Sequence, residues 1–314
     1  LIARIETFTQ DSGLPLSLKN FIGYYHLDPR SIYGKFSFSR LCADAGVLDD
    51  FIEPAEIILT KAFSKLVAVD SRRWIKFLTD ILPRFSCELA ASLSDFEKRM
   101  LQMFYITVFQ EAADWRSHTT QANMQLLADS PIMMHELNEL LSFNLERIDF
   151  IDQPVPLGFD CPLDLHCTYT RDQILIAMDY MTPKNVREGV KWLPDKQVDV
   201  FFITLNTADK DYSPTTMYND YSINESLFHW QSQSTTSDTA STGQRYINHR
   251  QRGSKVVLFV REFKQDSIGA APYTCLGTAV YVKHTGSKPM NITWHLDQPI
   301  PAKYLRKTNK LVVG

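Results

Sequence analysis

The amino-acid sequence predicts an α+β protein, with a helical first half followed by a mainly antiparallel β second half. Up to about residue 150, apolar residues recur at the i, i+3, i+4 spacing of amphipathic helices. From residue 198 onward, short runs rich in β-branched and aromatic residues alternate with turn signals, which is typical of strands. The chain has 314 residues, of which 44% are hydrophobic, enough for two cores. We therefore expect two domains, residues 1–160 and 161–314.

The first half is predicted to hold several amphipathic helices. Pro54 stands at a plausible first helical position, and an apolar stripe follows over residues 57–66. Further helices are expected over residues 72–82, 94–113 and 131–145. The first of these three ends before a proline, which cannot continue a helix.

Local signals support these helices and their cores. Ser94 and Glu97 have the spacing of a capping box at a helix start. Met and aromatic residues on the apolar stripes are expected to pack in the core rather than to contact a cofactor. They are Met100, Phe104, Met124, Met133 and Met134.

A proline-rich stretch over residues 152–162 marks the change between the halves, because it disfavours helix. Thr170 is expected to cap one more helix, with Ile174, Leu175 and Met178 on one face. Strands are then predicted over residues 199–205, 227–231, 255–263, 276–284 and 290–296. Residues 265–269 and 285–288 carry hairpin-type turn signals.

Charge is distributed unevenly along the chain. The whole sequence has 33 basic and 36 acidic residues, a net charge of −3. Residues 1–170 hold 15 basic against 23 acidic residues, net −8, whereas residues 171–314 hold 18 against 13, net +5. Residues 245–314 alone hold 12 basic against 3 acidic residues, net +9. This last stretch is expected to attract a polyanion, although a merely solvated surface is the alternative.

Several function classes lack their motifs. The sequence has no G-x-x-x-x-G-K-[ST] phosphate loop, no G-x-S-x-G elbow and no H-E-x-x-H. We therefore expect no catalysis and no cofactor in this chain itself. The longest apolar stretch, residues 198–205, is too short to cross a membrane, so no membrane partner is expected.

The five cysteines are predicted to be thiols of a cytoplasmic protein. Their number is odd and their spacing fits no disulfide framework. Cys161, His166 and Cys167 offer ligand atoms, but their spacing is not that of a structural zinc site, and no metal is expected. The chain starts at Leu1 without a secretion signal, and we expect it to be a fragment of a longer protein.

One nuclease-like pattern stands at the end of a predicted strand. Glu262, Phe263 and Lys264 form an E-x-K triplet, which some nucleases use with an upstream Asp to hold Mg²⁺. Asp238 is the nearest candidate partner, and Asp199 and Asp220 lie further away in sequence. Alternating Glu and Lys at a strand end also serve solvation, which is the interpretation we favour.

A cluster of aromatic residues is the strongest binding signal. Tyr212, Tyr218, Tyr221, Phe228 and Trp230 lie within nineteen residues and alternate with amides, hydroxyls and Asp220. A pocket for a planar polar ligand needs this combination of ring faces and edge-reading groups. The alternative is that these aromatic residues pack in a β core.

The residues of the second half also resemble a known family. The resemblance is carried by residues 198–206, 211–221, 228–233, 243–249, 260–263 and 299–302. These residues are similar to the C-terminal region of bacterial proteins that join a phospholipase-D-type nuclease and a DEAD/DEAH helicase to it. In that family the arrangement belongs to ATP-dependent type IV restriction enzymes, which cut DNA with modified cytosine. The resemblance implies a helical coupling domain followed by a reader like the SRA domain of the PUA superfamily.

The SRA resemblance assigns roles to individual residues. In SRA domains two aromatic residues sandwich a flipped 5-methylcytosine, and Tyr218 and Trp230 keep the separation of that pair. The family has an Asp three residues after the first aromatic, where this chain has Tyr221 and places its carboxylate one residue earlier, at Asp220. The edge-reading residue and the choice between methyl and hydroxymethyl therefore stay open. Gln231 and Ser232 are expected to line the pocket with Tyr221.

Together these expectations describe a non-catalytic DNA-recognition module. It would bind double-stranded DNA containing 5-methylcytosine or 5-hydroxymethylcytosine by base flipping, with Arg245, Arg250, Arg252 and Lys255 on the DNA backbone. The resemblance implies helicase and nuclease domains in the same polypeptide, and ATP and Mg²⁺ as their cofactors. The alternative is a protein-interaction and coupling module with only nonspecific DNA binding.

Overall fold

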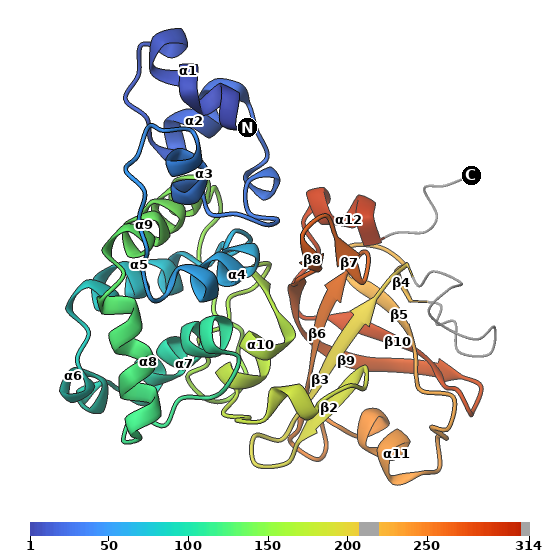
Figure 1. The fold of residues 1–314 in the computed structure, drawn as a ribbon. Helices are drawn as coiled ribbons and strands as arrows, with labels where there is room; N and C mark the ends of the chain where they lie inside the picture. Colours follow the sequence, from blue (N-terminus) through green and yellow to red (C-terminus); the bar gives the residue numbers. More distant parts are fainter. Residues whose placement is uncertain (207–219, 309–314) are drawn as a thin grey trace. The chain divides into compact units, whose positions relative to one another are not determined.

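The computed structural model describes residues 1–206 and 220–308, and the chain divides into two compact units (Figure 1). The helical unit contains Leu1–Asp152, Thr168–Pro183 and Ser267–Gly269. The sheet unit contains Gln153–Cys167, Lys184–Asp266 and Ala270–Gly314. The α+β class predicted from the sequence is confirmed. None of the helices among the described residues is long and apolar enough to cross a membrane.

The helical unit is built from helices most of which are capped at their start by a serine or threonine side chain. Its helices are α1 (Ile2–Ser12), α2 (Leu18–Tyr25), η1 (Pro29–Ser31), α3 (Phe38–Asp44), α4 (Glu56–Leu66), α5 (Arg72–Ile81), η2 (Leu82–Arg84), α6 (Cys87–Ser92), α7 (Asp95–Phe109), α8 (His118–Ala128), α9 (Pro131–Glu146) and α10 (Arg171–Ala177). The predicted capping box at Ser94 and Glu97 is present. Thr170 and Gln173 form a second one at the start of α10.

Two carboxylates, the buried Glu136 and the half-buried Glu53, bind helix starts in ways that the sequence pattern does not reveal. Glu136 accepts hydrogen bonds from the backbone N–H groups of Phe38 (2.6 Å) and Ser39 (2.8 Å) at the start of α3. Glu53 accepts from Ile132 (2.8 Å) and the next residue at the start of α9. Each carboxylate thereby satisfies N–H groups that a helix start leaves without partners. The prediction for Pro54 was wrong, since α4 begins at Glu56.

The sheet unit is organised around one mixed sheet. Its strands are β2 (Val190–Leu193), β3 (Val198–Thr204), β4 (Tyr221–Ser222), β5 (Leu227–Gln231), β6 (Lys255–Arg261), β9 (Tyr273–Thr285) and β10 (Asn291–Leu296). Their order is β2-β3-β6-β9-β10-β5-β4, and only the β3–β6 pair of this path is parallel. A separate two-stranded sheet is formed by β7 (Gln265–Asp266) and β8 (Gly269–Ala270). Before β2 the chain also forms the short strand β1 (Thr168–Tyr169) and the 3₁₀ helix η3 (Pro183–Asn185).

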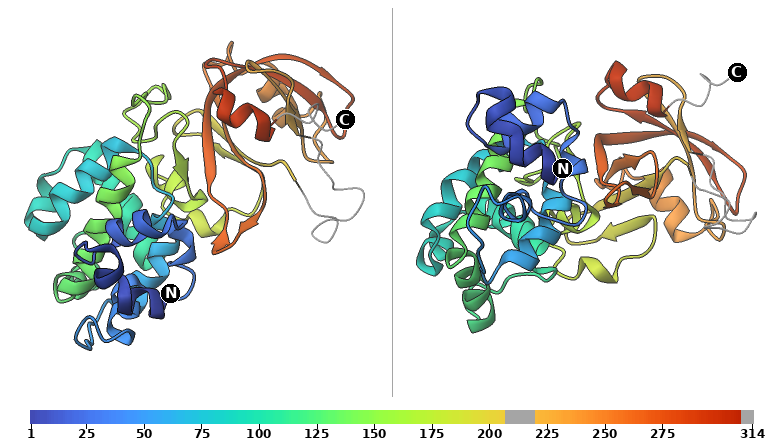
Figure 2. Two further views of the ribbon diagram at one scale, coloured as in Figure 1. Left: turned by 90° about the horizontal axis from the view of Figure 1, so that it is seen from above. Right: turned by 45° about the horizontal axis from the view of Figure 1, so that its top comes forward.

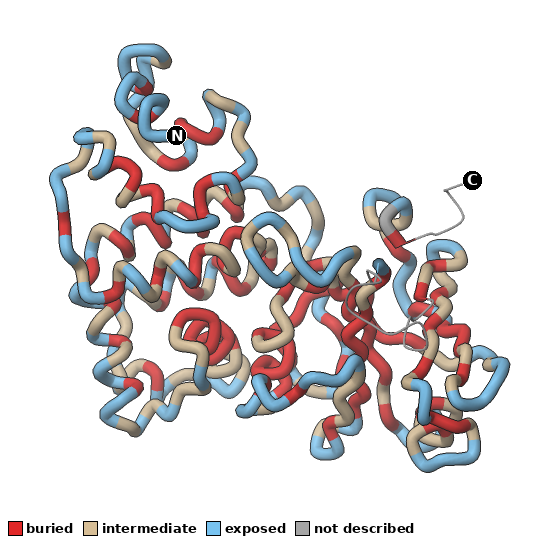
Figure 3. The backbone as a smooth tube through the Cα atoms, turned by 45° about the vertical axis from the view of Figure 1, so that its right-hand side comes forward, coloured by how far each residue is buried: buried red, intermediate tan, exposed pale blue. Residues whose placement is uncertain are grey.

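The largest core cluster of the sheet unit lies on one face of this sheet, and the central strands β3 and β6 are also buried on their other face. Figure 3 shows buried residues running along its central strands. In β5 the burial alternates: Phe228 and Trp230 are buried, whereas Leu227, His229 and Gln231 are half-buried. The alternation is the period of two that a strand with one face on a core requires. It divides the residues of β5 between two environments.

Two short helices close opposite ends of the sheet, as the views in Figure 1 and Figure 2 agree. The first is α11 (Ser241–Ile247), next to the turn between β9 and β10, and the second is α12 (Ala302–Thr308), which contacts β4. Gly243 lets α11 approach closely, because a Cβ there would lie 2.0 Å from the backbone oxygen of Ser237. The end that carries α11 is also where β6 begins and β9 ends.

The units exchange segments around the predicted boundary at residue 160. Gln153–Cys167 belongs to the sheet unit, and Cys275 accepts and donates backbone hydrogen bonds with its last two residues. Thr168–Pro183 returns to the helical unit, where Thr168 bonds to Asp70 (2.7 Å). A single boundary at residue 160 therefore does not reproduce the observed units, because segments on both sides of it form hydrogen bonds with residues that are distant in the sequence.

Candidate nucleic-acid interface

Trp230 is a core residue in the structure. Its side chain is 5% exposed and packs against Phe201, with ring centroids 4.3 Å apart, and against Tyr246 at 5.6 Å. A ring enclosed in this way offers no face on which a base could stack. The assignment of Trp230 to a stacking pair is therefore corrected: the period of β5 turns its side chain into the core. Its expected partner, Tyr218, lies outside the described residues.

Two further pocket candidates hold the backbone near the end of β5. Asp220 is buried, and its Oδ1 accepts the backbone N–H of Gln231 (2.8 Å). Ser232 is fully buried, and its Oγ accepts the backbone N–H of Met290 (2.8 Å). Both side chains thus bond to backbone N–H groups at the end of β5 and the start of β10. Asp220 and Ser232 are therefore buried and hydrogen-bonded to the backbone, whereas the sequence predicted that they line an open pocket.

Tyr221 and Gln231 lie on the other face of the sheet. Tyr221 stacks on His229, with ring centroids 4.8 Å apart and an interplanar angle of 15°. Gln231 donates a hydrogen bond from Nε2 to the side-chain oxygen of Asn291 (3.2 Å). All four side chains are half-buried. The predicted pocket residues are therefore separated by the sheet, with Trp230 on one side and Tyr221 and Gln231 on the other.

The strand register extends this second face across four strands, β4, β5, β10 and β9. One row consists of Tyr221, His229, Thr293 and Lys283, each paired with the next. Two neighbouring rows are Gln231, Asn291 and Thr285, and Leu227, His295 and Val280. Paired residues in antiparallel strands point to the same side of a sheet. We call these ten residues the outer face; none of them is acidic.

The outer face was only partly visible in the sequence. Tyr221 and Gln231 were named there, but Lys283 and Asn291 were not. The strand pattern alone does not give the register between β9 and β10, which shifts at a bulge between Thr293 and Trp294. A signal existed in the alternation of β5, because both of its polar residues, His229 and Gln231, are half-buried.

Arg245 is held inside the sheet unit. Its guanidinium forms a two-point ion pair with the fully buried Asp199, at 2.7 Å and 2.9 Å, and lies over the Trp192 ring at 4.5 Å. Burial raises the pKa of the Asp199 carboxyl, and the guanidinium opposes that rise. An arginine bonded twice to a buried carboxylate has its charge compensated within the protein. Its predicted place on a DNA backbone is corrected to a structural one.

The other three predicted backbone contacts differ among themselves. Lys255 donates from Nζ to the carbonyl of Pro156 (2.6 Å), so it too has an internal partner. Arg250 and Arg252 are exposed in the turn between α11 and β6. Within residues 1–206 and 220–308, neither arginine forms an ion pair. These two remain suited to phosphate contact.

His249 anchors the turn that carries the two exposed arginines. Its Nδ1 lies 3.2 Å from the carbonyl oxygen of Ser254, and its Nε2 accepts the backbone N–H of Tyr281 (3.1 Å). A carbonyl only accepts and an N–H only donates, so the ring must carry its proton on Nδ1 and stay neutral. Burial lowers the pKa of His249, in agreement with this form.

Four exposed cations gather at the end of the sheet where β6 begins and β9 ends. Arg250 and Arg252 lie before β6, Lys283 lies near the end of β9, and Lys288 lies in the turn between β9 and β10. We call these four residues the basic end. Lys283 belongs to both the basic end and the outer face, so the two surfaces are continuous.

The nuclease-like triplet does not assemble with its candidate partner. Glu262 and Lys264 follow the end of β6, whereas Asp238 accepts a hydrogen bond from Ser287 (2.9 Å) in the turn before β10. These positions lie at opposite ends of the sheet, about 20 Å apart for a strand of this length. Among the described residues, no group of three or more His, Cys, Asp or Glu could hold a metal ion.

The cysteines form no disulfide, and all five lie in the described part of the chain. The nearby His166 has its Nε2 buried without a hydrogen-bond partner. Burial, with a smaller effect from Lys303, lowers the pKa of His166 to about 4. Its imidazole is therefore neutral at neutral pH.

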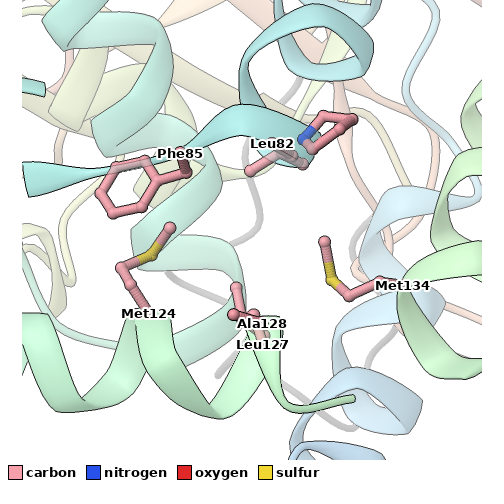
Figure 4. Close-up of a pocket in the computed structure, with 7 residues that line it drawn as sticks. Leu82, Phe85, Met124, Leu127, Ala128 and Met134 are labelled. Atoms are coloured by element: carbon pink, nitrogen blue, oxygen red, sulfur yellow. The ribbon is translucent and has the colours of Figure 1, made fainter. Parts of the chain in front are cut away.

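The helical unit contains one further feature, an apolar cavity of about 250 Å³ (Figure 4). Met124 and Phe85 face Met134 across it. The remaining lining residues are Leu82, Pro83, Leu127 and Ala128. Met100, Phe104, Met124 and Met133 are buried as predicted, whereas Met134 is half-buried. The lining has no ionisable side chain, so the cavity offers no acid–base chemistry.

Comparison with known proteins links the second half of the chain to one family. A family described as a domain of unknown function (DUF3427) matches residues 163–307, which is less than half of the chain. The match includes the outer face and the basic end. No curated protein matches the chain.

Proposed function

We propose that the sheet unit is a DNA-recognition module and that the basic end is its contact with the DNA backbone. The observation that carries this proposal is the exposure of Arg250 and Arg252, which form no ion pair with any described residue, at the same end of the sheet as the exposed Lys283 and Lys288. Cations that neutralise phosphates release condensed counterions, which gives a favourable and salt-dependent binding term. The net charge of +9 over residues 245–314 supports the same partner.

The finer proposal is that this module reads modified cytosine within a type IV restriction enzyme. It rests on the resemblance to the C-terminal region of nuclease–helicase fusions and to SRA domains of the PUA superfamily. The helical unit would couple DNA binding to the helicase and nuclease, which would use ATP and Mg²⁺. The chain itself would be non-catalytic, and the absence of disulfides among its cysteines agrees with a reducing cytoplasm.

An electrophoretic mobility shift with matched duplexes tests both levels of this proposal. Three duplexes of one sequence would carry cytosine, 5-methylcytosine or 5-hydroxymethylcytosine. The finer proposal predicts tighter binding to at least one modified duplex. Equal affinity for all three would contradict the reading of modification, and no binding to any of them at low salt would contradict DNA recognition itself.

A coupling module with only nonspecific DNA affinity is the second candidate. The observation that favours it is the use of Trp230 and Asp220 inside the sheet unit, because both were expected to hold the flipped base. This candidate predicts equal affinity for the three duplexes together with a steep salt dependence. The same mobility-shift experiment, repeated across a salt series, separates the two candidates.

A further inference from the structure

We propose that the outer face binds the bases of an unpaired DNA strand, with Tyr221 and His229 as the stacking platform. This inference rests on the proposed DNA binding and names the form of DNA that the outer face takes. It assigns a ligand to a surface that lies on the opposite side of the sheet from Trp230. The basic end would hold phosphates, and the outer face would hold bases.

The geometry of the aromatic pair supports stacking. The rings of Tyr221 and His229 are nearly parallel, with an interplanar angle of 15°, and both side chains are half-buried. Among the described strands β4 is the last of the sheet, so none of them lies beside Tyr221 on its far side. A base arriving at this edge can extend the existing stack. Stacking of this kind tolerates any base, because every base has a π face.

The surroundings of the pair fit a base more closely than they fit an apolar partner. Gln231 and Asn291 place two amides in the neighbouring row, 3.2 Å apart at their bonded atoms. Amides can donate to and accept from the edges of bases that are no longer paired. Leu227 and Val280 are the only aliphatic residues among the ten residues of the outer face.

The charge of the outer face selects an anion. It carries Lys283 and no acidic residue, and through Lys283 it continues into the basic end. A strand whose phosphates follow the cations would bring its bases over the sheet. Single-strand binding surfaces combine a cationic path for phosphates with aromatic platforms in this manner.

Fluorescence anisotropy of the full chain with two labelled 15-mers tests the proposal. One oligonucleotide is dT15, and the other is an abasic strand of equal length and charge. Phosphate contact alone gives both strands the same affinity, whereas stacking gives dT15 an advantage of about tenfold or more. Tyr221→Leu should remove most of this advantage, and Tyr221→Phe should keep it because the ring remains.

Three outcomes would overturn the proposal. These are equal affinity of the unaltered chain for the two strands, an unchanged dT15 advantage in both Tyr221→Leu and His229→Ala, and a loss in Tyr221→Phe as large as in Tyr221→Leu. Circular dichroism of each variant identifies folding defects, and an unchanged affinity for the abasic strand confirms an intact basic end. If a duplex is bound while dT15 and the abasic strand are bound equally, the proposed function survives and this inference fails.

Discussion

The two faces of the sheet use the same kinds of residue for different purposes. On the core face, Trp230 packs against Phe201 and Tyr246. On the outer face, Tyr221 stacks on His229 at the sheet edge. Each group contains a residue of the aromatic cluster, Trp230 or Tyr221, and β5 contributes to both. Aromatic residues that cluster in a strand region can therefore serve different purposes, because successive side chains of a strand point to opposite faces of the sheet.

The same contrast holds for the arginines. Arg245 is bonded twice to the buried Asp199, whereas Arg250 and Arg252, a few residues later, are exposed. The net positive charge summed over a segment of sequence therefore overstates the charge that is available to a partner. The basic end consists of cations that are exposed, whereas Arg245 is paired within the protein.

The largest expected effect concerns the core face. Trp230→Ala should lower the free energy of unfolding by about 3–5 kcal/mol, because it leaves a cavity among packed rings. His229→Ala, the matched change at the preceding residue of β5, should lower the free energy of unfolding by less than about 1 kcal/mol. Chemical denaturation of the two variants measures both values. A smaller loss for Trp230→Ala than for His229→Ala would break the assignment of the faces.

A smaller effect should follow from the half-buried imidazole of His166. Its pKa falls from 6.5 to about 4 on folding, mainly because burial disfavours the charged form. The unfolded chain therefore binds the proton more readily, and stability should decrease as the pH falls from about 6.5 towards 4. We expect His166 to account for about 1–2 kcal/mol of this decrease, since the residue is half-buried and solvent screens part of the effect.

Comparison with His166→Asn isolates this contribution. Asn tolerates the left-handed backbone of His166, whose φ is 64°, and does not titrate. Denaturation of both proteins at pH 7 and pH 4 should show a smaller loss of stability in the variant. An equal loss in both proteins would show that His166 does not carry the pH dependence.

Much of the fold was predictable because its signals are local. The capping residues Ser94 and Thr170 lie within three residues of the groups they satisfy. The strand over residues 227–231 was predicted with its observed bounds from composition and flanking turn residues. Periodicity also placed α9 to within one residue of its end.

The rest depended on contacts that join distant residues. The interleaving of the units follows from bonds such as that between Thr168 and Asp70, 98 positions apart. The removal of Arg245 from the candidate interface follows from Asp199, 46 positions away. The position of Lys283 on the outer face depends on a bulge in the β9–β10 pair. Such long-range pairings cannot be deduced from the local patterns of a single sequence.

The contact of the basic end with the DNA backbone is tested most directly by the salt dependence of duplex binding. The test variant is Arg250→Ala/Arg252→Ala, and the control is Arg306→Ala, an exposed arginine on α12 at the opposite end of the sheet. The slope of log K against log salt should become shallower by about 2 in the double variant and change little in the control. A double variant with an unaltered slope, or a larger change in Arg306→Ala, would contradict the account.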